Sequence, residues 1–461
     1  MAKEKLKKFN EYTSRLLPHE TAYLTEVFTI DDPERLSILE IVKHNSIQTA
    51  DRMAFDVSLD KRKYSRLLQW IQSELDKIDV DQKMSWIIQT RQNILLDNVS
   101  IELEKRILKE IKKANISDFN FLLFYEMLIQ YRHYLIIRMR YQDHQLVHDF
   151  IEKYQFDYKS SKLIFEQLHQ ATFDIIGGGG DIKHEAIQWG NWLKENFNNK
   201  RLDGLSRHMS AVRYIFICIR YGMIEDLRKM LEDLDAFFVK GSNYSKRLLV
   251  NFYSNMMVYH DLIRDYENAK YYGCLSIKYV YQDTTIYYNN LVNVLLKMGN
   301  YEEALEAIET AHFKVANTKN MHSAIGFISN NVRCLSKLGR HQEAITKGRV
   351  FLKAYQKQIL KYRWHRFFSA YHGALLSQQK YREIIKNTEQ FGLHLKEDQP
   401  NVTSNKSQVL NIYYQLALYN SRPSFRQSAK YKLNDMSISP EEDYDNELIQ
   451  LVREVLNQEI N

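Results

Sequence analysis

The sequence predicts an all-α fold, a two-helix-repeat α-solenoid preceded by a helical N-terminal region. Only 15 Gly and 5 Pro occur among the 461 residues, about 4% where average usage gives about 12%. Both residue types break helices, and no proline lies between Pro33 and Pro400. Between about 116 and 391 the apolar residues recur at helical spacing, with no alternating runs that would indicate strands.

The bulk composition narrows the classes of protein and of partner. Apolar residues make up 44% of the chain, so it can bury a core and does not have the composition of a disordered protein. With 64 Lys and Arg against 57 Asp and Glu, the net charge is only +7, and basic and acidic residues are interspersed along the chain. This charge suits a protein or peptide partner, including an acidic one, and does not favour nucleic acid.

Cysteine use and hydropathy predict a cytoplasmic protein. The three cysteines, Cys218, Cys274 and Cys334, are far apart and form no CxxC pair, which fits a reducing compartment. The Lys-rich N-terminus is followed by charged residues instead of the apolar segment of a secretory signal. The purest apolar run, 214–219, is far too short for a membrane span, so no membrane partner is expected.

Residues 1–115 form a helical N-terminal region or a cap for the solenoid. Asp32 before Pro33, with Glu34 following, is typical of a helix start, because Asp caps the free N–H groups and Pro fits the first turn. Further helices are expected at about 34–43, 60–78, 81–95 and 99–114.

Helical hairpins repeat along residues 116–392. In the clearest one, 287–311, one apolar helix face precedes a turn at Gly299-Asn300 and a second helix follows it. Equivalent turns are predicted at Gly222, Arg264, Gly339 and Gln379, which gives a period of 35 to 42 residues that is typical of solenoids. By spacing alone, two more turns are expected near Arg140-Tyr141 and Gly180-Asp181. After them, 393–461 is expected to be a polar loop to 407 and a helical cap.

Two of these turns resemble the tetratricopeptide repeat (TPR). The segments Gly-Asn-Tyr-Glu-Glu-Ala at 299–304 and Gly-Arg-His-Gln-Glu-Ala at 339–344 carry its turn glycine and the small alanine that lets two helices approach closely. The units around 287–311 and 328–351 match well and the others loosely, since several units approach 40 residues and lack the usual proline. The resemblance implies a superhelix whose first helices line a concave groove.

Basic, aromatic and amide side chains gather on the first helix of each predicted two-helix unit. Such a groove would suit an extended peptide or an acidic tail, because Arg and Asn side chains bond to main-chain groups and carboxylates. The alternative is that the rings belong to the core and the charges only solvate the surface. The candidate partner-binding residues are Arg213, Arg220, Asn289, Asn293, Asn330, Arg363 and Arg366.

Other motifs do not indicate catalysis. The four glycines at 177–180 lack the frame of a phosphate-binding loop and are expected to connect two helices. His144 and His148 share a helix face, but no third metal ligand is placed beside them. No catalytic triad or paired acid and base can be assembled, so the sequence predicts a non-catalytic interaction scaffold or adaptor without cofactor or metal.

An alternative function is a peptide-sensing transcriptional regulator whose residues 34–78 bind DNA. Helices at 38–42, 49–54 and 61–71 loosely resemble a helix-turn-helix, and the last one is basic. Against it, Arg62 falls where a buried residue is needed and Asp56 stands where glycine is usual. An enzyme with an unrecognised site is the third and weakest alternative.

Overall fold

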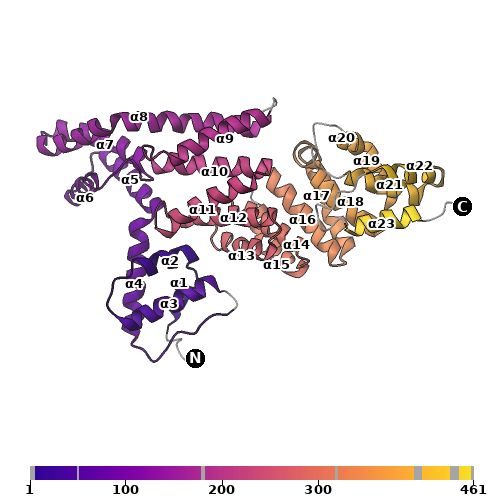
Figure 1. Ribbon diagram of the computed structural model, residues 1–461, viewed down its shortest axis with the longest axis horizontal. Helices are drawn as coiled ribbons and strands as arrows, with labels where there is room; N and C mark the ends of the chain where they lie inside the picture. The colour runs from indigo at the N-terminus through magenta and orange to yellow at the C-terminus, as the bar shows by residue number, and fades with distance from the viewer. Residues whose placement is uncertain are drawn as a thin grey trace. The chain divides into compact units, whose positions relative to one another are not determined.

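The computed structural model describes residues 6–48, 51–177, 182–316, 320–398, 408–436 and 446–457. Within these ranges the chain forms 23 α-helices and one short 3-10 helix, and no strand (Figure 1). The predicted all-α class is therefore confirmed, whereas the solenoid arrangement stays a prediction. The chain divides into two compact units, Met1–Asn255 and Met256–Asn461, and the predicted boundaries after residues 115 and 392 likewise stay predictions.

Unit 1 contains the first eleven helices and the beginning of the twelfth, which continues into unit 2. Helix α7 packs on α5 and α8, and α10 packs on α8, α9 and α11. The helices are α1 (Lys7–Thr13), α2 (Pro18–Glu26), α3 (Pro33–Ile47), α4 (Lys61–Ile78), α5 (Val80–Leu95), α6 (Ile101–Ile111), α7 (Phe121–Ile137), α8 (Tyr141–Gly177), α9 (Ile182–Asn198), α10 (Gly204–Tyr221), α11 (Ile224–Val239) and α12 (Lys246–Leu262).

The N-terminal helices form where the caps predicted them, with one exception. Asp32 caps α3, since its carboxylate accepts a hydrogen bond from the Arg35 amide at 3.2 Å. The prediction of a short helix at 49–54 is wrong for its described residues 51–54, which form a bend and a stretch without regular secondary structure. There Asn45 exchanges two hydrogen bonds with the Met53 main chain, and these bonds replace helical ones.

Helix α2 joins the N-terminal region to helices more than 200 residues later in unit 1. The His19 ring lies between Tyr253 Oη at 2.7 Å and Asp235 Oδ1 at 2.8 Å. The buried Glu20 carboxylate accepts hydrogen bonds from the Leu17 amide and from Tyr244 Oη. Because these partners belong to α11, α12 and the loop between them, the N-terminal helices pack as part of unit 1.

The predicted turns share one backbone feature. Gly222, Gly299 and Gly339 all have φ between 67° and 78°, and Arg264 and Gln379 adopt the same left-handed conformation with φ of 61° and 52°. A residue in this conformation ends a helix by turning the chain. All five of these turn positions are confirmed; the turn near Arg140 has its left-handed residue at Met139, and the one near Gly180 lies outside the described residues.

Unit 2 contains a row of helices in which, from α14 onward, the first helix of each hairpin contacts the first helix of the next. Helix α14 packs on α16, α16 on α18, and α18 on α21, while α15, α17 and α19 each pack on the helix before them. The helices are α13 (Tyr266–Ser276), α14 (Thr284–Lys297), α15 (Tyr301–Ala316), α16 (Met321–Lys337), α17 (His341–Tyr362), α18 (Trp364–Ser377), α19 (Tyr381–Phe391), α20 (Leu393–Glu397), α21 (Val409–Ser421), α22 (Arg426–Asp435) and α23 (Asn446–Asn457), with the 3-10 helix η1 (Pro423–Phe425) before α22.

The polar segment after Phe391 differs from the expected loop. Residues 393–397 form α20, in which Leu393 is fully buried. The buried Glu397 carboxylate accepts hydrogen bonds from the Leu410 and Asn411 amides at 3.1 and 2.8 Å, and so satisfies free N–H groups at the start of α21. The segment is therefore helical and anchored by the buried Leu393 and Glu397, although its composition is polar.

Candidate binding site

Three first helices of unit 2 place amide and guanidinium groups in one row. Helix α14 buries Leu291 and Leu295 and turns Asn289 and Asn293, one helical turn apart, toward another side. Helix α16 starts where Asn320 caps the Ser323 amide and carries Asn330. Helix α18 starts directly after Arg363 and carries Arg366. We call Asn289, Asn293, Asn330, Arg363 and Arg366 the polar row.

Hydrogen bonds connect the polar row from helix to helix. Asn289 Nδ2 donates to the Ser323 carbonyl at 2.8 Å, and Asn330 Nδ2 donates to the Asn289 carbonyl at 3.2 Å. Arg366 Nη2 donates to Asn330 Oδ1 at 2.8 Å and to Asn293 Oδ1 at 3.1 Å. Since Arg366 lies 73 residues after Asn293, these bonds hold three successive hairpins in register.

Arg363 lies over a glycine at the centre of the row. A Cβ atom on Gly326 would be 3.2 Å from Arg363 Nη1 and 3.5 Å from Asn289 Nδ2, so the missing side chain leaves room for both groups. No hydrogen bond or ion pair joins the Arg363 guanidinium to another described residue. The residue is exposed, yet the protein atoms around its guanidinium withdraw it in part from water and lower its pKa.

Two further rings lie beside Arg363: Tyr362, which belongs to the basic and aromatic stretch 361–366 of the sequence, and His322, which sequence reasoning missed. The rings of His322 and Tyr362 lie 4.8 Å apart. Burial, and then the positive charge of Arg363, lower the pKa of His322. A signal was present in the sequence, because His322 lies near the start of its helix as Arg363 does, one repeat apart. The row is thus flanked by an imidazole and a phenol, both able to hydrogen-bond a ligand.

The two predicted arginines of unit 1 have a different environment. Arg213 Nε donates to the Leu168 carbonyl at 3.2 Å and to Thr172 Oγ1, and Arg220 Nη1 donates to the Ile175 carbonyl. All three acceptors belong to α8. Burial lowers the pKa of Arg213, which remains a cation bonded to protein groups. These side chains therefore connect α10 to α8, and their predicted part in partner binding stays untested.

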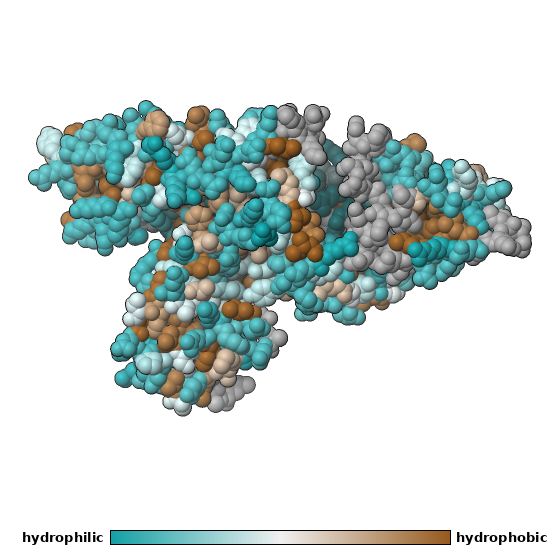
Figure 2. Space-filling view, viewed as in Figure 1, coloured by the Kyte–Doolittle hydropathy of each residue, from teal (hydrophilic) through white to brown (hydrophobic). Residues whose placement is uncertain are grey.

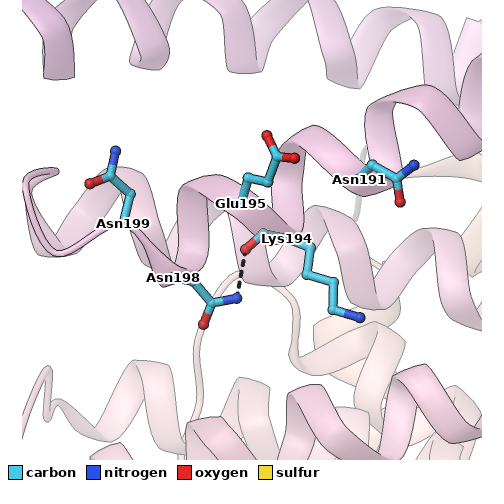
Figure 3. A pocket seen from close by; sticks show the side chains of 5 residues that line it. All are labelled: Asn191, Lys194, Glu195, Asn198 and Asn199. Carbon is cyan, nitrogen blue, oxygen red and sulfur yellow. Dashed lines mark hydrogen bonds between the residues drawn. The ribbon is translucent and has the colours of Figure 1, made fainter.

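An open depression on α9 is a second place where polar side chains gather. Its volume is about 550 Å³, and the structure places Asn191, Lys194, Glu195, Asn198 and Asn199 around it. In Figure 3 the Glu195 carboxylate projects away from the Lys194 ammonium, and Asn198 Nδ2 donates to the Lys194 carbonyl at 2.9 Å. Lys194 also pairs with Asp226 at 3.2 Å. Because its cation is already paired, this depression offers less to a ligand than the polar row.

The described residues contain few groups suited to nucleophilic or metal chemistry. Burial raises the pKa of Cys218 to about 12 and that of Cys334 to about 11, so neither is a thiolate at neutral pH. The rings of His144 and His148 lie 5.9 Å apart, and His148 Nδ1 is 3.3 Å from Arg132 Nη1. Among the described residues, no three His, Cys, Asp or Glu side chains are placed to share a metal ion.

None of the described helices is both long enough and apolar enough to cross a bilayer. In comparisons with family models, with curated proteins and with solved structures, nothing matches this chain.

Proposed function

We propose that this chain is a non-catalytic interaction scaffold that binds an extended, acidic peptide segment of a partner protein on the polar row. The observation that carries the proposal is Arg363, an exposed cation without a carboxylate partner among the described residues. It lies beside amides that connect α14, α16 and α18. A TPR-like arrangement would place this row in a concave groove.

The row offers both kinds of contact that an extended peptide needs. Within the described residues, Asn289 Oδ1 is buried and accepts no hydrogen bond, so this side chain has to rotate before a peptide N–H can donate to it. The Arg363 guanidinium can bind a carboxylate through two parallel hydrogen bonds, which are stronger than bonds between neutral groups. The amides would therefore bind the main chain of an extended peptide, and the arginine would favour a peptide with acidic side chains.

The test uses the full chain and a fluorescein-labelled peptide of ten residues with Asp and Glu in its C-terminal half. Fluorescence anisotropy should show saturable binding to the wild type. Arg363→Glu plus Arg366→Glu should weaken it at least tenfold, about 1.4 kcal/mol, because two attractive charges become repulsive. A neutral peptide with amides in place of the acids should bind more weakly.

The matched control reverses two charges outside the row. Arg382 and Lys386 are exposed on α19 of the same unit, and Arg382→Glu plus Lys386→Glu should leave the affinity within twofold. Equal affinity of the wild type and the Arg363 and Arg366 variant would disprove the site. If the Arg363 and Arg366 variant and the Arg382 and Lys386 variant weaken binding equally, the peptide is attracted only by the overall positive charge of the protein.

A second candidate function, DNA binding by a peptide-sensing regulator, rests on helix α4. Lys61, Arg62 and Arg66 are exposed there, while Tyr64 and Leu67 are buried. Exposed cations along one helix suit phosphate contacts. The missing helix at 51–54 argues against a helix-turn-helix, so this function ranks second.

Binding of the full chain to a random-sequence duplex at low salt tests the second candidate. Substituting Lys61, Arg62 and Arg66 together by alanine should abolish the binding and flatten its salt dependence. If the wild type does not bind at low salt, this candidate fails without affecting the peptide site.

A further inference from the structure

A basic helix face of unit 1 lies outside the polar row. Lys105 and Lys109 of α6 and Lys112, the residue directly after its end, are all exposed. Their spacing of four and three residues places them along one stripe of the helix. Among the described residues, no ion pair joins these lysines to a carboxylate. The opposite side of α6 buries Ile107 and Ile111 in the core of α5, α7 and α8, so the lysine stripe faces outward.

Exposed hydrophobic side chains lie at the N-terminal end of this stripe. Ile101 is 65% exposed and shares the stripe with the lysines, and Leu95 and Leu96 just before it are 61% and 68% exposed. At the turn between α7 and α8, Ile137 and Met139 are 75% and 72% exposed. Exposed apolar side chains gathered in this way mark interaction surfaces more often than isolated ones do.

Two ion pairs hold these apolar segments next to each other. Arg138 Nη2 lies 2.8 Å from Asp97 Oδ1, and Arg140 Nη1 lies 3.0 Å from Glu104 Oε2. The first pair connects the loop after α5 to the turn after α7, and the second connects that turn to α6. Figure 2 shows hydrophobic atoms among hydrophilic ones at the end of unit 1 where Figure 1 places α6, α7 and the start of α8.

We propose that this face is a second partner site, which binds an amphipathic helix that carries Asp or Glu at matching positions beside large apolar side chains. A rise of 1.5 Å per residue means that Lys105 to Lys112 extends over about 10 Å, two turns of a partner helix. Acidic residues three or four positions apart on that helix meet the lysines in turn. Its apolar side chains cover Ile101, Leu95 and Leu96.

Other occupants fit these observations less well. A second copy of this chain, docked by the same face, would set lysines against lysines, and like charges across an interface repel. An anionic bilayer would lay negative headgroups over the whole face, including Glu102, an exposed acid next to Ile101. An acidic helix can instead place its carboxylates over the lysines and its apolar residues over the leucines.

The test uses the full chain and a synthetic fluorescein-labelled helix of about 20 residues with Glu and Leu on one face. Anisotropy should show saturable binding that weakens between 0.15 and 0.5 M NaCl as the charges are screened. Lys105→Glu plus Lys109→Glu should weaken it at least tenfold, and Leu95→Ser plus Leu96→Ser about fivefold. The matched control, Lys353→Glu plus Lys357→Glu, reverses two exposed lysines with the same spacing on α17 and should change nothing.

Three outcomes would overturn the proposal. The first is equal affinity of the wild type and the Lys105 and Lys109 variant for the helix. The second is binding to anionic phosphatidylglycerol vesicles, lost in the same variant, without binding to the helix. The third is a dimer of the wild type, seen by sedimentation, that this variant dissociates. Arg363→Glu plus Arg366→Glu should leave the helix probe bound, so this site and the polar row can fail separately.

Discussion

Each unit contains a pair of arginines on a first helix or directly before it, and the two pairs have different hydrogen-bond partners. In unit 1, Arg213 and Arg220 donate to main-chain carbonyls and a threonine hydroxyl of α8. In unit 2, Arg366 donates to two side-chain amides, and Arg363 has no described hydrogen-bond partner. Main-chain acceptors belong to the fold itself, whereas side-chain amides can exchange partners. Arginine therefore joins helices in both units, and of these four residues Arg363 alone lacks a side-chain hydrogen bond to another described residue.

The largest expected effect comes from removing the arginines of unit 1. Arg213→Ala plus Arg220→Ala removes the hydrogen bonds that α10 donates to the Leu168 and Ile175 carbonyls and to Thr172 Oγ1 of α8, and should cost about 3 kcal/mol of unfolding free energy. Hydrogen exchange measured by mass spectrometry on peptides of α8 and α10 would report it. Arg363→Ala plus Arg366→Ala should cost about 1.5 kcal/mol in unit 2, because Arg363 has no hydrogen bond to lose among the described residues and Arg366 loses its bonds to two amides. Similar losses from both pairs would show that the arginines of unit 2 contribute as much to folding as those of unit 1.

The second prediction concerns a close backbone contact in unit 1. A Cβ atom on Gly204 would lie 2.9 Å from both Phe119 Cα and the Ser117 carbonyl oxygen. Backbone atoms cannot move aside, so Gly204→Ala should destabilise unit 1 by about 2 kcal/mol. Urea unfolding followed by circular dichroism would show a lower midpoint. An unchanged midpoint would mean that the loop before Phe119 yields easily.

The third prediction concerns a buried histidine in unit 2. His372 is fully buried among aromatic rings, and neither ring nitrogen has a partner among the described residues. Burial lowers its pKa to about 3, so the unfolded chain takes up a proton below about pH 6.5 that the folded chain does not. Stability contributed by the neutral ring is present above this pH and is lost as the pH falls toward 3.

By pH 5 this loss should reach roughly 2 kcal/mol, and His372→Leu should remove it. Urea unfolding at pH 7 and pH 5 measures the difference. Unit 1 offers a parallel test, since burial lowers the pKa of His208 to about 4. An equal pH dependence of the wild type and the His372→Leu variant would show that water reaches the ring.

The sequence predicted the helices and turns better than the partners of the candidate residues. Turns at Arg264 and Gln379 were found without glycine, because the apolar spacing around them repeats that around Gly299. The five residues of the polar row were predicted, and the structure brings them together in unit 2. Nothing local distinguishes Arg213 from Arg366, because their acceptors lie on helices elsewhere in the chain. Helix α20 escaped prediction for the same reason: the amides that Glu397 caps come after it.

Gly326→Ala in unit 2 is expected to change stability least. It parallels Gly204→Ala in unit 1, because both substitutions add a Cβ atom at a close contact. Gly326→Ala adds a Cβ atom 3.2 Å from Arg363 Nη1, the mobile end of a long side chain. Alanine favours the helix by about 0.5–1 kcal/mol, which should offset the slight displacement, so the unfolding midpoint should hardly change. The acidic peptide should nevertheless bind more weakly, because Arg363 is pushed from its place. Loss of stability comparable with that of Gly204→Ala would show that Arg363 is as fixed as the backbone of unit 1, and the distinction between the two arginine pairs would fail.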